Sequence, residues 1–339
     1  MTVLLSGIGI ATSDGLGRDA LANLVHGRSQ SATDRGDSRD AEQAADLRAT
    51  ADLPLVTRLS IGAATEAWTE AGAVVSGVEA SRIGLYAGST NGLLRELEAY
   101  EADLATRAFA AARPSVYQEL TLGALTGHVS IALQTRGPIL PLNHGWLSTY
   151  DALEFAIDDL MDEVVDAALL LGVDVAESTD DRDTTSAPPS VAVALVLTRA
   201  GQEADAGLGA YGSVLQGGAL RASSPPAVQA ALRSLLATTS DACGGAIDVI
   251  VGTPSLAVDA ATVCGDAQTT PLMLTAPASI GSVASCDLLL AVASLALHGA
   301  RETSRAGKGM ACGISEEGGV AVIGLRALRG APCAEGFVT

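Results

Sequence analysis

Gly137-Pro-Ile-Leu-Pro-Leu-Asn-His-Gly-Trp-Leu-Ser-Thr-Tyr-Asp-Ala152 is the stretch that decides the fold. It predicts a short strand that turns sharply into a helix, and the strand-like Ala167-Ala-Leu-Leu-Leu-Gly-Val-Asp174 follows that helix. A strand-to-helix elbow is where α/β acyl-transfer enzymes expose a reactive side chain. The elbow residue here is Trp146, and an indole cannot attack a thioester. The sequence therefore predicts an elbow without a nucleophile.

Composition bounds the class of protein. The 339 residues can bury a large core, as one domain or as two closely packed halves. The 48% hydrophobic content and 37 glycines are typical of an α/β protein with many tight turns. The net charge of −19 argues against binding to nucleic acid or to an anionic membrane.

Targeting signals and metal ligands are not expected. We find neither a signal peptide nor an apolar run of the roughly 18 residues that a membrane helix needs. The five cysteines are widely spaced and form no Cys-x-x-Cys pair, which speaks against a zinc site or a disulfide framework. The sequence predicts a cytoplasmic protein with no metal and no cofactor.

Strand-like and helix-like segments alternate twice along the chain. We expect strands at Val3–Thr12, Arg82–Gly88, Ala167–Asp174, Ser190–Thr198, Ala246–Gly252, Pro271–Thr275 and Gly319–Leu325. We expect helices at 57–75, Leu93–Ala112, Gln118–Gln134, Ala227–Thr238 and Val283–His298. This alternation predicts an α/β fold with parallel-rich sheets and helices on both faces.

The first strand contains Gly7-Ile-Gly9, which is part of a dinucleotide-binding fingerprint. The third glycine is missing, and no acidic ribose partner is evident in the polar stretch that follows. These glycines therefore do not favour nucleotide binding.

In their order and spacing, these segments resemble the β-ketoacyl synthases of the thiolase fold. The resemblance rests on Leu5-Ser-Gly-Ile-Gly-Ile-Ala-Thr12, on Arg82-Ile-Gly-Leu-Tyr-Ala-Gly-Ser89, and on Thr126-Gly-His-Val-Ser-Ile-Ala-Leu133 before Gly137-Pro138. It implies two similar βα halves in a layered α-β-α-β-α architecture. The implied division is an N-terminal half at 1–175, a linker at 176–189, a C-terminal half at 190–327 and a tail at 328–339.

Synthases of this kind use an elbow cysteine, two histidines and a lysine. Matched by motif, the four positions hold residues without that chemistry: Trp146, Val251, Ser282 and Pro277, respectively. The closing loop, which normally contains gating phenylalanines, corresponds to Cys312-Gly-Ile-Ser-Glu316. Condensation needs a thiolate and donors for an oxyanion, so the resemblance implies a degenerate catalytic site.

This pattern is similar to that of chain length factors, the inactive partners in type II polyketide synthases. The resemblance implies a non-catalytic subunit that forms a heterodimer with an active ketosynthase and meets the acyl carrier protein through that complex. Residues of the implied tunnel and interface are Leu120, Thr121, Gly123 and Ala124, whose modest size favours an extended, polyene-like chain. Small residues also suit close helix packing. Trp146 departs even from this group, which often has glutamine at the elbow.

Alternative interpretations remain open at this stage. Trp146 either plugs a dead acyl pocket or is ordinary core packing. The chain could instead be a free-standing acyltransferase or hydrolase that uses Cys312, which its flanking glycines could leave accessible, or Ser148. His144 with Ser148 and Asp151 suggests a triad, but triad members normally come from separate elements, so we expect a structural histidine. A homodimeric acyl-binding protein is a third possibility.

Overall fold

The structure is a computed structural model of the 339-residue chain. It describes residues 2–13, 17, 53–107, 114–175, 190–201, 211–242, 247–252, 272–275, 286–301, 308–314 and 319–327. The strands are β1 (Val3–Thr12), β2 (Ile83–Gly88), β3 (Ile139–Leu142), β4 (Ala167–Val175), β5 (Ser190–Arg199), β6 (Gly212–Arg221), β7 (Val249–Gly252), β8 (Leu272–Thr275), β9 (Lys308–Ile314) and β10 (Gly319–Ala327). The α-helices are α3 (Leu55–Ala71), α4 (Leu94–Arg107), α5 (Pro114–Gln118), α6 (Leu122–Leu133), α7 (Ser148–Met161), α9 (Pro225–Ala242) and α11 (Cys286–Arg301). Two short 3-10 helices are η1 (Gly72–Val74) and η2 (Ala80–Arg82).

The sheet topology repeats once along the chain. The strand order is β3-β2-β4-β5-β1-β6-β10-β9-β7-β8. When each run of five strands is read from the outer edge of the sheet inward, its strands follow in the order third, second, fourth, fifth and first along the chain. The pairing directions repeat as well. In each run the outer three strands are parallel, and the fifth strand is antiparallel to both of its neighbours. Four strands of each run therefore point the same way, as expected, while the fifth strand (β5 or β10) is reversed and makes the sheet mixed.

Strand pairing groups β5 with the first run of five, between β4 and β1, so the topological repeat begins at β6. The predicted linker at 176–189 lies outside the described residues. The division into halves at these residues stays a prediction.

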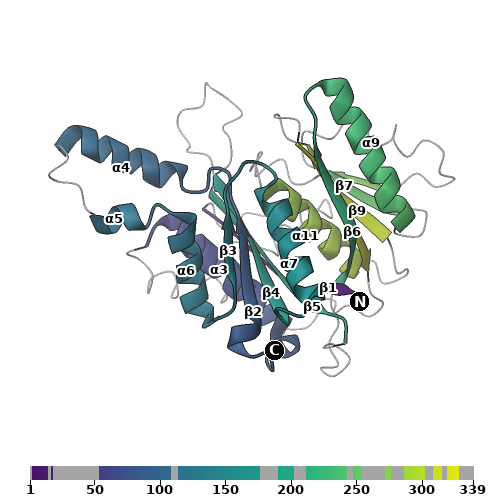
Figure 1. The fold of residues 1–339 in the computed structure, drawn as a ribbon, viewed down its shortest axis with the longest axis horizontal. Helices are drawn as coiled ribbons and strands as arrows, with labels where there is room; N and C mark the ends of the chain where they lie inside the picture. The colour runs from purple at the N-terminus through teal and green to yellow at the C-terminus, as the bar shows by residue number, and fades with distance from the viewer. Residues whose placement is uncertain are drawn as a thin grey trace, which may run out of the picture.

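Helices fill the layers around and between the two runs of strands. α3 packs on β1 and β5 with α6 beside it, α7 and α11 contact each other in the middle, and α9 packs on β6 and β10. Figure 1 shows the same arrangement, with α3 and α6 on one side, α7 and α11 in the centre, and α9 on the other side. Buried side chains form three hydrophobic clusters between these layers. The layers follow one another in the predicted α-β-α-β-α order.

Central strands are buried on both faces, which explains their continuous apolar sequences. In β5, side chains alternate between the central cluster and the cluster beneath α3. The first set is Val191, Val193, Leu195 and Leu197, and the second is Ala192, Ala194 and Val196.

The glycines of β1 bring α3 unusually close to the sheet. A Cβ atom at Gly7 would lie 2.1 Å from the carbonyl oxygen of Ala67, and one at Gly9 would lie 1.9 Å from that of Ala63. These contacts are with helix backbone, so neither position has room for a side chain. The Gly7-Ile-Gly9 pair therefore serves helix–strand packing.

Along part of β1, two glutamates of α3 accept the backbone N–H groups that a neighbouring strand would otherwise accept. β1 pairs with β6 only from Val3 to Leu5. Farther along, the backbone N–H of Ile8 donates to Glu70 Oε2 at 2.7 Å, and that of Ile10 donates to Glu66 Oε2 at 2.9 Å. Because buried N–H groups need acceptors, these carboxylates allow β1 and β6 to diverge.

Two strands were not predicted. β6 contains Gly217 and Gly218, and a Cβ at Gly218 would lie 2.6 Å from Leu235 Cδ2 of α9. β9 (Lys308–Ile314) includes Cys312-Gly-Ile314, although the family resemblance implies a closing loop there; residues 315–318 lie outside the described part. In the described residues, no helix is both long and apolar enough to cross a membrane.

Candidate functional site: the buried elbow

The predicted elbow is confirmed: β3 ends at Leu142 and α7 begins at Ser148. Gly145 has φ +102°, a conformation that favours glycine. The Ser148 hydroxyl accepts the backbone N–H of His144 at 3.0 Å and donates to the Gly145 carbonyl at 2.6 Å. This pair of hydrogen bonds holds the turn against the first residue of the helix.

Trp146 lies at this turn and is 8% exposed. It belongs to the central hydrophobic cluster, together with Tyr86, Tyr150 and Val251. β2 is pressed against the start of α7, since a Cβ at Gly88 would lie 2.4 Å from the Thr149 backbone nitrogen. The elbow therefore presents an indole to the core.

Two phenols of the same hydrophobic cluster are hydrogen-bonded to carboxylates on α7. Tyr86 donates to Asp159 Oδ2 at 2.5 Å, and Tyr150 donates to Glu154 Oε1 at 2.8 Å. Burial first, and then these hydrogen bonds, raise the pKa of both phenols above its usual value. Both tyrosines are therefore neutral donors near pH 7.

Val251, the predicted position of the first histidine, is fully buried in β7 and offers no proton-transfer group. Pro277 and Ser282, the predicted positions of the lysine and the second histidine, lie outside the described residues. The assignment of these four positions to a degenerate catalytic site stays a prediction.

The structure does not assemble a triad from His144, Ser148 and Asp151. The imidazole of His144 is paired with the Asp151 carboxylate, while the Ser148 proton is donated to the Gly145 carbonyl. Only the backbone N–H of His144 contacts Ser148. His144 is therefore structural, as the sequence predicts, and Ser148 stabilises the turn at the start of α7.

Neither described cysteine is an accessible nucleophile. Cys312 is fully buried in β9, and its Sγ donates to the Val251 carbonyl at 3.6 Å, which speaks against the alternative that uses an accessible Cys312 thiol. Cys286 is buried at the start of α11. Burial, followed by the charges of Asp174 and Asp287, raises the pKa of the Cys286 thiol well above its usual value.

A carboxylate clamp beside the elbow was missed by sequence reasoning. Asp174 of β4 is fully buried and accepts the backbone N–H groups of Thr90 at 2.8 Å and Asn91 at 2.6 Å. Ser89 Oγ also lies 3.3 Å from Asp174 Oδ1. The clamp fixes the turn that leaves β2 just after Gly88. The polar Ser-Thr-Asn turn is its only signal in the sequence.

The predicted tunnel residues lie around the start of α6. Thr121 caps this helix, because its Oγ1 accepts the backbone N–H of Ala124 at 3.1 Å. Thr121 and Gly123 are exposed, while Leu120 and Ala124 are half-buried. They are therefore close to the molecular surface, and a role in a tunnel or an interface stays a prediction.

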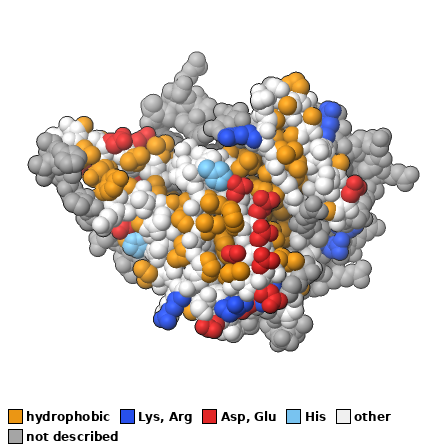
Figure 2. Space-filling model, in the orientation of Figure 1, with side chains coloured by type: hydrophobic (Ala, Val, Ile, Leu, Met, Phe, Trp, Pro, Cys, Tyr) orange, Lys and Arg blue, Asp and Glu red, His pale blue; other side chains and the backbone are white. Residues whose placement is uncertain are grey.

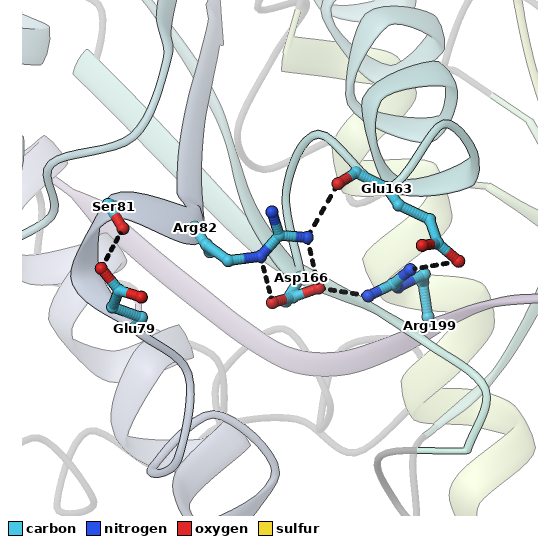
Figure 3. Close-up of polar contacts among 6 residues, drawn as sticks. All are labelled: Glu79, Ser81, Arg82, Glu163, Asp166 and Arg199. Carbon is cyan, nitrogen blue, oxygen red and sulfur yellow. Dashed lines mark hydrogen bonds and ion pairs between the residues drawn. The ribbon is translucent and has the colours of Figure 1, made fainter.

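Figure 3 shows an ionic network that lies where β2 and β4 begin, whereas the elbow follows the last residue of β3. Asp166 accepts from Arg82 Nε at 2.5 Å and Nη2 at 2.9 Å, and it also pairs with Arg199. Glu163 pairs with Arg199 at 3.1 Å. The hydrogen bond from Arg82 is the main cause that lowers the pKa of Asp166. This network joins the beginnings of β2 and β4 to the end of β5.

Asp166→Asn is expected to lower the free energy of unfolding near pH 7 by about 1–2 kcal/mol, because it leaves two arginines with a weaker acceptor. The pKa of Asp166 is lower in the folded protein, so its stabilisation is present above the unfolded pKa of about 3.9 and is lost as the pH falls further. Urea titrations at pH 7 and pH 3 should show the difference shrinking in acid. Glu79→Gln is the control, because Glu79 accepts an exposed hydrogen bond from Ser81 and acts on Arg82 only as the weakest of the causes that raise the pKa of Arg82. If Asp166→Asn lowered stability as much at pH 3 as at pH 7, the assignment would be contradicted.

The layers, the repeated topology and the buried elbow define a thiolase-like α/β protein. The profile described as the N-terminal domain of β-ketoacyl synthases matches residues 13–188, more than half of the chain. The chain belongs to the β-ketoacyl synthase family. No curated protein matches the sequence significantly.

Solved structures of this family share the fold. The ishigamide ketosynthase/chain length factor is 17% identical with a TM-score of 0.72, covering 97% of this chain and 100% of that chain. A second match is a type II polyketide synthase acyl-carrier protein in complex with its ketosynthase, bound to the hexaketide. It is 12% identical with a TM-score of 0.75, and the match covers 96% of this chain and 99% of that chain. A β-ketoacyl synthase from Burkholderia phymatum STM815 is 15% identical with a TM-score of 0.71, and the match covers 97% of this chain and 100% of that chain. These likenesses confirm the predicted thiolase-like fold.

Proposed function

We propose that this chain is a non-catalytic ketosynthase-like subunit of the chain length factor type. The observation that carries the proposal is the buried indole of Trp146 at the start of α7. Acyl transfer to a synthase requires a nucleophile at such an elbow, and an indole cannot form the thioester. Val251 is likewise an aliphatic residue in the position proposed for a catalytic histidine.

Other candidate nucleophiles do not support an independent enzyme. Cys312 is buried within a strand, and the hydroxyl of Ser148 is hydrogen-bonded to the elbow backbone. The acyltransferase or hydrolase interpretation therefore has no accessible nucleophile among these residues.

The subunit would act by pairing with an active β-ketoacyl synthase in the cytoplasm and shaping the tunnel in which a polyketide chain grows. Leu120, Thr121, Gly123 and Ala124 are the residues we assign to that tunnel and interface. The acyl carrier protein would deliver the chain through the partner's active site. The names of two similar structures, a ketosynthase/chain length factor and a ketosynthase–carrier complex, are consistent with this proposal.

Co-expression with its active β-ketoacyl synthase partner is expected to give a stable 1:1 complex, because each subunit covers apolar surface of the other. The chain expressed alone should aggregate or self-associate. Size-exclusion chromatography with light scattering measures both outcomes. A well-behaved monomer that binds no ketosynthase would contradict the proposal.

Incubation of the purified complex with an acyl-carrier thioester is expected to leave the mass of this chain unchanged while the partner gains an acyl group. Intact-mass spectrometry resolves the two subunits. A stable acyl adduct on this chain would instead support the enzyme alternative, and tight acyl binding by a homodimer without any partner would support an acyl-binding protein.

A further inference from the structure

A side-chain hydrogen bond closes the turn between α5 and α6. Glu119 follows the last residue of α5, and its Oε2 lies 2.7 Å from Nε2 of His128 in the second turn of α6. An ionised carboxylate only accepts, so the imidazole N–H donates. The side chains of His128 and Glu119 are 28% and 31% exposed. The bond therefore ties the turn before α6 to the body of that helix at the edge of solvent.

All of the residues that we assign to the tunnel lie inside the loop that this bond closes, namely Leu120, Thr121, Gly123 and Ala124. Thr121 adds two shorter ties, since its Oγ1 accepts the backbone N–H of Ala124 at 3.1 Å and donates to the Gln118 carbonyl at 3.4 Å. Side chains within and at both ends of the segment therefore fix its backbone.

Packing against the sheet holds α6 more firmly than α5. α6 contacts α3, β2 and β3, and its Leu122 and Leu125 are buried in the cluster beneath α3. Among the described elements, α5 has no comparable packing partner, and its Tyr117 is 61% exposed. The direction in which the chain enters α6 therefore depends on the local bonds, and the carboxylate–imidazole bond spans the whole turn.

Few charged side chains compete for this bond. His128 is the only ionisable residue of α6. Figure 2 shows a column of acidic side chains over α7 and few charged side chains around α6. Exposed pairs contribute little to stability, because water competes for both groups. We therefore expect the bond to affect the conformation of the turn and not whether the chain folds.

We propose that Glu119 and His128 are positioning residues for chain-length control, because their bond holds the segment 120–124 in the conformation that sets the length of the growing polyketide. The inference rests on the proposed function, in which that segment is assigned to the tunnel. The turn has room to shift once the bond is lost: for a Cβ placed at Gly123, the nearest neighbouring atom is Thr121 Oγ1, 3.9 Å away.

The test uses the purified complex of this chain with its active ketosynthase, malonyl-loaded acyl carrier protein, and mass spectrometry of the chains formed. Glu119→Ala and His128→Ala should each lower the ratio of the main chain length to its neighbours by about two- to fivefold, the range for losing an exposed pair. The double variant should lower it no further, because both changes remove one bond. Glu119→Gln keeps a carbonyl acceptor and should restore the wild-type distribution.

Two further variants separate the bond from the tunnel assignment and from general effects of lost charge. Gly123→Leu adds a side chain where the segment has open space, and it should shorten the chains. Glu79→Ala removes a carboxylate that accepts a local hydrogen bond before η2, and it should leave the distribution unchanged. All complexes should melt close to the wild-type temperature, because the bonds removed are exposed.

Three outcomes would overturn the inference while Gly123→Leu still shortens the chains, and the proposed function would then stand. They are alanine variants with the wild-type distribution, a Glu119→Gln variant that matches Glu119→Ala, and alanine variants that no longer form the 1:1 complex. If Gly123→Leu leaves the chain length unchanged, or if the wild-type chain binds no ketosynthase, the tunnel assignment and the proposed function fail together with the inference.

Discussion

Gly9→Ala is expected to prevent the chain from reaching its folded state. The new Cβ would lie 1.9 Å from the Ala63 carbonyl oxygen and 2.8 Å from the Ala67 backbone nitrogen. Both atoms belong to the backbone of α3, so no side-chain rotation relieves the overlap, and the helix must move away from the sheet. We expect a loss of about 3 kcal/mol or more in the free energy of unfolding, at the upper end for overpacked cores. Soluble yield and the urea midpoint measure it.

Gly62→Ala is the matched control, since it makes the same chemical change at the same helix–strand contact. A Cβ at Gly62 would meet only the Cβ of Ala11, at 4.0 Å. Because alanine is the better helix former, this variant should be as stable as the wild-type chain or more stable by about 0.5–1 kcal/mol. Equal urea midpoints for the two variants would show that α3 is not held against β1 as described.

The strands with continuous apolar sequences could be predicted from the sequence. The sequence predicts β1 with the bounds that it has, and β5 ends one residue later than predicted. Most of their side chains are apolar on both faces because helices cover both faces, so the pattern itself marks burial. The elbow before α7 could also be predicted, because the sequence changes from a short strand to a helical segment within Gly137–Ala152.

β6 and β9 could not be predicted because their sequences lack that signal. Gly217 and Gly218 interrupt β6, and glycine is unfavourable in a strand when only local preferences are considered. The structure supplies a non-local reason: Gly218 leaves room for Leu235 of α9, and Gly217 lies near Tyr150 of α7. A pattern of local preferences has no access to neighbours that distant in the sequence.

The same limit applies to the site. Trp146 and Val251 were assigned by comparison with a family motif, and both are buried in the central cluster. The Asp174 clamp was missed because its partners are 83 and 84 residues away in the chain. The hydrogen bonds from the β1 backbone to Glu66 and Glu70 were missed for the same reason, since they span 56 and 62 residues.

Trp146→Ala should cost about 3–5 kcal/mol of folding free energy, because it removes a large buried side chain from a packed cluster. If the indole plugs an acyl pocket, the variant should also gain affinity for an apolar probe. The space left by the indole would be lined by side chains of the same cluster, such as Tyr86, Tyr150 and Val251. An apolar cavity the size of a large side chain stays dry and accepts apolar molecules. Urea denaturation measures the loss, and calorimetry with decanoate measures the gain.

Trp68→Ala is the control, because Trp68 is the other tryptophan of the chain and is half-buried in the cluster beneath α3. It should lose less stability and gain no affinity for decanoate, since removing a partly exposed ring opens no enclosed space. A Trp146→Ala variant that loses stability but binds no decanoate would show that the cluster collapses around the smaller residue. In that case Trp146 is core packing and does not plug an acyl pocket.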